Sequence, residues 1–196
     1  MRNRVVLVLG VIVLAVCDQA IEYPSTAGLA RVASFQITPR DSEELKRLHD
    51  DDQADRVPKA INWGVVTPRD RARATRVKEF LATGGIHTPN DYYNAALILQ
   101  HGETPEDFLL AHEFCVVAMM LGKNDIESSS LAAAAEDRFL MNIGRPQRFG
   151  TQFRSEGSGP LRLYPVRGGV TDELRRLMAV PSLAEAKAQE AELNRK

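Results

Sequence analysis

The pattern of apolar and polar residues along this chain predicts a protein built mainly of α-helices. Between residues 41 and 143, apolar residues recur at the spacings of three and four that place them on one side of a helix. Glycines interrupt this pattern at intervals and are typical of helix ends. Helices are therefore expected over residues 41–56, 68–82, 89–101, 105–121 and 125–143. Because the connections are mostly short, neighbouring helices are expected to pack antiparallel.

The starts of four helices are predicted by one recurring motif, Thr-Pro-x-Asp. At such a start the threonine caps the helix, the proline occupies the first turn, and the aspartate favours the positive helix end. A fifth start is predicted at Asn124, with Glu127 three residues later as a variant of the capping box. The unequal spacing of the motifs excludes a helical repeat array. The four motifs begin at Thr38, Thr67, Thr88 and Thr104.

The periodicity changes after Gly144, where short segments with aromatic and branched residues appear. Residues 148–154 and 161–166 flank a Ser-Glu-Gly-Ser-Gly-Pro segment, a pattern typical of a two-stranded hairpin. Two more helices are expected over residues 171–178 and 182–195, the second with a capping box at its start. The predicted fold class is mainly α, an antiparallel assembly of five to seven helices with a small two-stranded hairpin near residues 148–166.

The N-terminal residues have the pattern of a secretory signal peptide. Arg2 and Arg4 precede an apolar run over residues 5–16, which has about half of the ~20 residues that a membrane-spanning helix needs. The run ends in Leu-Ala-Val-Cys, which resembles the lipobox of bacterial lipoproteins and makes Cys17 a candidate for lipidation. We expect a signal peptide over residues 1–17, a tether over 18–37 and a single helical domain over 38–196. A buried N-terminal strand or helix is the alternative.

These expectations place the protein outside the cytoplasm, in the cell envelope. It would be anchored to the membrane through its N-terminal signal or a lipid on Cys17, or released into the periplasm or the medium. The chain has 25 lysines and arginines against 26 aspartates and glutamates, and this balance provides no electrostatic basis for nucleic-acid binding. Its only other cysteine, Cys115, lies in an apolar helix and is expected to be a buried, inert thiol.

No metal site or cofactor is predicted. Asp50, Asp51 and Asp52 are consecutive, and successive helical residues point about 100° apart, so they cannot share one ion. We interpret this run as solvated charge, facing basic residues of the next helix. His101 and His112 are separated by a helix break and do not have the spacing of a zinc protease.

Four groups of polar residues have more hydrogen-bonding capacity than connections between helices need. On the first helix, an apolar face begun by Leu45 and Leu48 turns polar toward the helix end. Two further groups lie in the third and fifth helices, where Asp137 and Arg138 suggest a buried ion pair. The last group lies in the loop that follows Gly144. The candidate site residues are Asp52, Gln53, Arg56, Gln100, His101, Asp137, Arg138, Gln147, Thr151 and Gln152.

These groups together resemble a family of bacterial domains of unknown function. The resemblance rests on Asp-Gln-x-x-Arg at 52–56, Gln-His at 100–101, Asp-Arg at 137–138 and Pro-Gln-Arg-Phe-Gly-Thr-Gln at 146–152. It extends over about residues 41–183, and the last motif is its most specific part. In the family, tyrosine often stands where this chain has Phe149. The resemblance implies that the candidate residues occupy motif positions, and it implies no activity, substrate or cofactor.

Two functions remain open from the sequence. The first is a binding or structural module whose buried polar cluster orders the loop at 146–152 and holds a small polar ligand or a peptide. The alternative is a metal-independent hydrolase, with His101 as general acid or base, Asp137 orienting it and Arg138 stabilising an anion. The alternative requires His101 and Asp137 to lie within hydrogen-bond reach.

Overall fold

The computed structural model of this protein describes residues 39–195, except for residues 59 and 158. The predicted signal peptide, the lipidation candidate Cys17, the tether and the first helix cap Thr38 lie outside the described residues. Within the described ranges, no helix has the length and hydropathy needed to cross a membrane.

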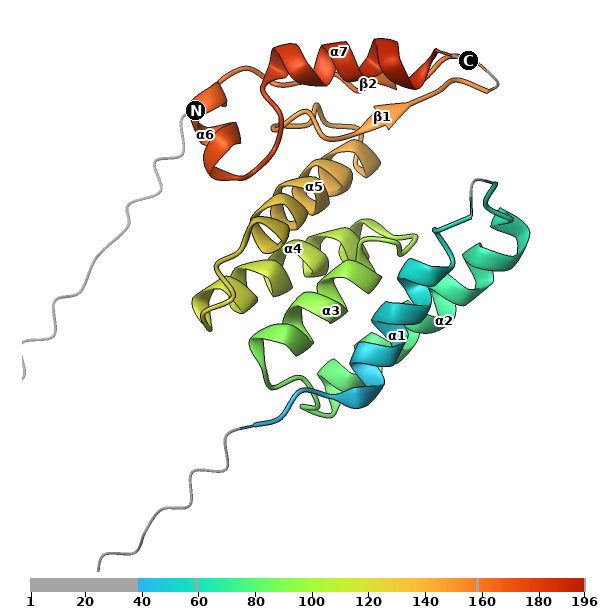
Figure 1. The fold of residues 1–196 in the computed structure, drawn as a ribbon, viewed down its shortest axis with the longest axis vertical. Coiled ribbons are helices and arrows are strands. Elements are labelled where there is room, and N and C mark those ends of the chain that lie inside the picture. Colours follow the sequence, from blue (N-terminus) through green and yellow to red (C-terminus); the bar gives the residue numbers. More distant parts are fainter. Residues whose placement is uncertain (1–38, 59, 158, 196) are drawn as a thin grey trace, which may run out of the picture. The chain divides into compact units, whose positions relative to one another are not determined.

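The described part of the chain forms seven helices and one short hairpin (Figure 1). The strands β1 (Phe153–Arg154) and β2 (Arg162–Leu163) pair antiparallel, with Phe153 opposite Leu163. This confirms the predicted mainly helical fold with a small hairpin. The helices are α1 (Glu43–Ala54), α2 (Trp63–Ala82), α3 (Pro89–Leu99), α4 (Pro105–Met120), α5 (Ile126–Asn142), α6 (Asp172–Leu177) and α7 (Leu183–Leu193).

The main core is organised around α3 and α4. Helix α4 packs against α3 and α5, while α3 also contacts α1 and α2 (Figure 1). The side chains of Phe114 and Cys115 from α4 are buried together with Ile98 and Leu99 from α3. Burial raises the pKa of the Cys115 thiol to about 12, so this thiol is inert at neutral pH, as expected from the sequence.

The predicted helix starts at Thr88, Thr104 and Ser182 are confirmed, and each of the three forms a capping box. In the first of them, the buried Asp91 carboxylate accepts a hydrogen bond from Thr88 N at 3.2 Å. It also accepts one from Ser42 N at 2.7 Å. Because Ser42 is the residue that caps α1, this one carboxylate fixes the start of α1 against the start of α3.

Three predicted helix starts are wrong. Helix α1 is capped by Ser42 and begins at Glu43, so Pro39 and Asp41 of the first motif precede the helix. Helix α2 begins four residues before Thr67, so that Pro68 lies inside it and removes one backbone hydrogen bond. Tertiary contacts favour the longer helix, because Val66 is buried and the Asp70 carboxylate accepts from two arginines. Helix α5 is capped by Asp125 and not by Asn124, since the Asp125 carboxylate reaches Ser128 N at 2.8 Å.

A second, smaller cluster of apolar residues holds the loop at 146–152. Ala133 of α5, Phe149 of the loop and Val180 after α6 are buried together, and Leu174 and Met178 pack against them. The hairpin is held in turn by α7, whose Glu190 carboxylate accepts from Leu163 N at 2.7 Å. The loop is therefore positioned by α5 on one side and by α6 on the other.

Candidate functional site

The first part of the site is centred on Asp52, whose side chain is fully buried. Its carboxylate accepts hydrogen bonds from Gln53 Nε2 at 2.9 Å and from Arg56 Nη1 at 3.1 Å. Nδ1 of His101, which follows α3, lies 3.0 Å from Asp52 Oδ2. Four of the predicted residues therefore meet here. The interpretation of the run from Asp50 as solvated charge is wrong for Asp52, which lies on the inner face of α1.

Ion pairs extend this cluster onto α2. Arg56 Nη2 donates to Asp70 at 2.8 Å, and Arg73 Nη2 donates to the other oxygen of Asp70 at 2.6 Å. Arg73 also donates to Asp55 at 2.9 Å. Burial alone would lower the pKa of Arg73, but its hydrogen bonds with Asp70 and Asp55 outweigh this effect and raise the pKa. The positive charges of Arg56 and Arg73 are thus both compensated by carboxylates of the fold.

The second part of the site is centred on Asp137, which is also fully buried. The backbone N–H groups of Arg148, Phe149 and Thr151 donate to its carboxylate at 2.6, 2.9 and 3.0 Å, and Thr151 Oγ1 donates at 2.9 Å. Gly150 lets the loop wrap around the carboxylate, because its φ of 86° lies in the left-handed region that glycine adopts at no steric cost. Asp137 is the anchor of this loop.

These contacts correct two predicted pairings. His101 takes Asp52 as its carboxylate partner and not Asp137, whose oxygens are occupied by the loop. Asp137 and Arg138 do not form an ion pair, because adjacent residues of a helix point in different directions. The hydrolase that was predicted from the sequence, with Asp137 orienting His101, does not fit this geometry.

Two glutamines connect the loop with the hairpin. The buried amide of Gln147 donates to Gln152 O at 3.0 Å and to Tyr164 O at 2.7 Å, and it accepts from Gln152 N at 2.8 Å. Arg175 of α6, which is nearly fully buried, donates to Phe149 O at 3.0 Å from the other side. Gln147 and Arg175 both use their hydrogen-bonding capacity within the fold.

Arg138 joins the two parts of the site. Its Nη1 donates to Gln100 O, and its Nε donates to Gln152 Oε1 at 3.2 Å. Its guanidinium lies 5.8 Å from the ring centre of Phe108 on α4. No carboxylate of a described residue forms an ion pair with Arg138, although its side chain is mostly buried. Burial lowers the pKa of Arg138, and the nearby positive charge of Arg56 lowers it further.

The four predicted groups therefore converge in one network, which we call the Asp52–Asp137 network. Arg138 connects the loop to the end of α3, where Gln100 precedes His101 and His101 reaches Asp52. An open cavity of about 350 Å³ adjoins the network at Gln100 and Thr151. Among the groups of the network that make no hydrogen bond with any described residue are His101 Nε2, Arg138 Nη2 and the side-chain amide of Gln100.

Several members of this network are not predicted from the sequence. Asp70 belongs to the helix-start motif at Thr67, and Arg73 is one of the basic residues of the next helix, while no pattern marks Asp55 or Arg175. For Asp55, Asp70 and Arg73, the one available signal is that acidic residues gather at 50–55 and arginines at 69–73. Nothing in the sequence around Arg175 distinguishes it from the exposed Arg176 beside it.

Comparisons of the chain with protein families, with curated proteins and with solved structures found no match. In the described part of the chain, no group of three or more histidine, cysteine, aspartate or glutamate side chains is arranged to hold a metal ion. The proposals below therefore rest on the geometry of the network.

Proposed function

We propose that this domain binds a small molecule through an oxyanion, a carboxylate or a phosphate group, at Arg138 and His101. The observation that supports this proposal is the mostly buried guanidinium of Arg138, which has no carboxylate partner among the described residues. A buried charge without an opposite charge is costly, and folded proteins normally compensate it. A bound oxyanion would provide this compensation.

The donor groups suit such a ligand. The Nη2 atom of Arg138 has two N–H groups that make no hydrogen bond with a described residue and can donate to a carboxylate or a phosphate. Nδ1 of His101 is held by Asp52, and in the protonated form of the ring Nε2 has an N–H that can donate to the ligand. The side-chain amide of Gln100 makes no hydrogen bond with a described residue and lines the adjoining cavity. Arg138 and His101 do not line this cavity themselves, and Gln100 and Thr151 are the network residues that do.

The rest of the network supports this function indirectly. Asp137 and Gln147 fix the loop that carries Gln152, and Gln152 accepts from Arg138 Nε. Asp52 fixes the His101 ring. Groups held in this way are preorganised, so a ligand does not have to order them when it binds.

Ligand binding should be visible as thermal stabilisation of the full chain. We expect the melting temperature to rise saturably with inorganic phosphate or citrate, because a ligand that binds only the folded state stabilises it. Potassium chloride at matched ionic strength serves as the control and should leave the melting temperature nearly unchanged. A melting temperature that responds equally to chloride, or to none of the salts, would contradict the proposal.

Hydrolysis is a second candidate function, favoured by the distance of 3.0 Å between His101 Nδ1 and Asp52. A carboxylate at Nδ1 orients an imidazole whose Nε2 can take a proton from water, and Arg138 would stabilise the resulting oxyanion. With nitrophenyl acetate or nitrophenyl phosphate as probe, His101→Gln should abolish turnover without lowering the melting temperature. Equal rates in the wild type and in His101→Gln would exclude this function for His101.

A further inference from the structure

A cavity lined in part by arginines lies where α5 ends, and none of the side chains that line it belongs to the Asp52–Asp137 network. Aliphatic groups of Leu140, Ile143 and Pro146 line a cavity of about 610 Å³, together with three arginines. A neighbouring cavity of about 480 Å³ shares Leu140 and two of these arginines. We call the two contiguous cavities the α5 groove. Its arginines are Arg145, Arg148 and Arg167.

Backbone hydrogen bonds fix the two sides of the groove. Gly144, with φ of 71°, ends α5 and lets Arg145 N donate to Leu140 O at 2.8 Å, so the chain folds back over the helix end. On the other side, Arg167 N donates to Gln147 O at 2.7 Å. Arg145 and Arg167 are thereby both placed at the rim of the groove.

The charges at the groove are unbalanced. Arg148 pairs with Glu136 at 2.7 Å. The side chains of Arg145 and Arg167 are exposed and make no ion pair or hydrogen bond with any described residue. The groove therefore has three cations against one anion, in a chain whose net charge is −1. An anionic group is attracted to this rim, and it would find two guanidinium groups that no other residue occupies.

The floor of the groove is apolar beside this cationic rim. Ile143 leaves 46% of its surface exposed, next to Leu140 and Pro146. We infer that the groove binds an amphiphilic carboxylate, whose hydrocarbon part lies on these three residues and whose carboxylate contacts Arg145 and Arg167. This inference is independent of the oxyanion site, because the groove side chains make no hydrogen bond with Arg138 or His101.

Octanoate is the probe that tests this inference, measured by isothermal titration calorimetry on the full chain below the concentration of micelle formation. In the Arg138→Met variant, which lacks the guanidinium of the oxyanion site, we expect one octanoate per chain. In this variant octanamide, which has the same hydrocarbon part and no charge, should bind at least about tenfold more weakly, and acetate should show no measurable binding. Arg167→Gln and Arg145→Gln should each weaken octanoate binding by about tenfold.

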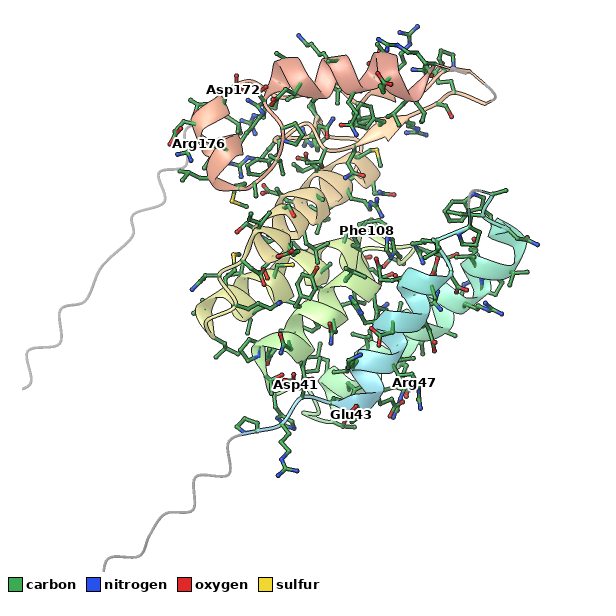
Figure 2. All side chains as sticks on the ribbon, in the orientation of Figure 1. Asp41, Glu43, Arg47, Phe108, Asp172 and Arg176 are labelled. Atoms are coloured by element: carbon green, nitrogen blue, oxygen red, sulfur yellow. The ribbon has the colours of Figure 1, made fainter. Side chains whose placement is uncertain are left out.

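Two variants serve as controls. Arg47 is an exposed arginine on α1 (Figure 2), and Arg47→Gln should leave octanoate binding unchanged. Arg138→Met removes the guanidinium of the oxyanion site, so the octanoate binding that remains in this variant belongs to the groove. The inference is overturned if octanoate does not bind, if octanamide binds equally well, or if Arg167→Gln has no larger effect than Arg47→Gln. None of these results bears on the binding of phosphate or citrate at Arg138.

Discussion

Replacing Asp137 by alanine is expected to lower the free energy of unfolding by about 4 kcal/mol, because several buried donors would lose a charged acceptor at once. Three backbone N–H groups and the hydroxyl of Thr151 donate to this one carboxylate. Urea denaturation followed by circular dichroism measures the change. The loop at 148–151 has no other carboxylate to wrap around, so we expect its order to be lost together with stability.

Two further variants show whether the carboxylate itself is responsible. Asp137→Asn keeps the shape of the side chain but turns an N–H group toward the N–H donors of the loop. It should therefore also lower the free energy of unfolding, by at least about 2 kcal/mol. The side chain of Asp51 lies exposed on α1 without a hydrogen bond to a described residue, and Asp51→Ala should change the free energy of unfolding by less than about 0.5 kcal/mol. An effect of Asp137→Ala as small as that of Asp51→Ala would refute the role of Asp137 as loop anchor.

Arg138→Met is expected to weaken the binding of citrate or phosphate about 100-fold, because it removes the buried cation that the oxyanion would compensate. The free energy of unfolding should change by no more than about 1 kcal/mol, because the loss of two hydrogen bonds is offset when an uncompensated charge is no longer buried. Calorimetric titration and urea denaturation of the same preparations measure the two quantities.

Arg162 provides the matched surface control for this variant. It is exposed on β2, its guanidinium pairs with Glu190 and not with a residue of the network, and Arg162→Met should leave citrate affinity unchanged. If Arg138→Met lowers the free energy of unfolding by more than about 2 kcal/mol and leaves citrate affinity intact, Arg138 has a structural role only.

The helices were largely predictable because their starts carry local chemical signals. Thr88 and Thr104 cap α3 and α4 with the aspartate three residues later, as the motif predicts. The same motif at Thr67 was misleading, because capping is a local effect of about 1 kcal/mol and tertiary contacts can outweigh it. The earlier start places Val66 inside α2, where its side chain is buried.

The membership of the polar site was predictable, but its pairings were not. Residues with excess hydrogen-bonding capacity stand out in a sequence, and all ten candidates in the domain lie in the Asp52–Asp137 network. Asp52 and His101 are 49 positions apart, so their contact depends on which faces of α1 and α3 meet. Sequence spacing does not determine that choice, and for this reason Asp137 was assigned to His101 in error.

The burial of two arginines was also not predictable from sequence spacing. Arg73 and Arg175 are buried and hold carboxylates or carbonyl oxygens, whereas Arg69 and Arg176 close by in the sequence are exposed. Each pair has the same residue type in similar local surroundings. The difference comes from the helix face that packs inward, which only the assembled fold defines.

The central claim is that an oxyanion binds at His101 and Arg138. The most direct measurement is a ¹H–¹⁵N NMR titration of the imidazole and guanidinium groups of the full chain with inorganic phosphate at constant pH. We predict saturable shifts of the His101 ring nitrogens and of Arg138 Nε, while the ring signals of His49, His87 and His112 stay in place. Unchanged signals of His101 and Arg138, or parallel shifts of all four histidines, would contradict the claim.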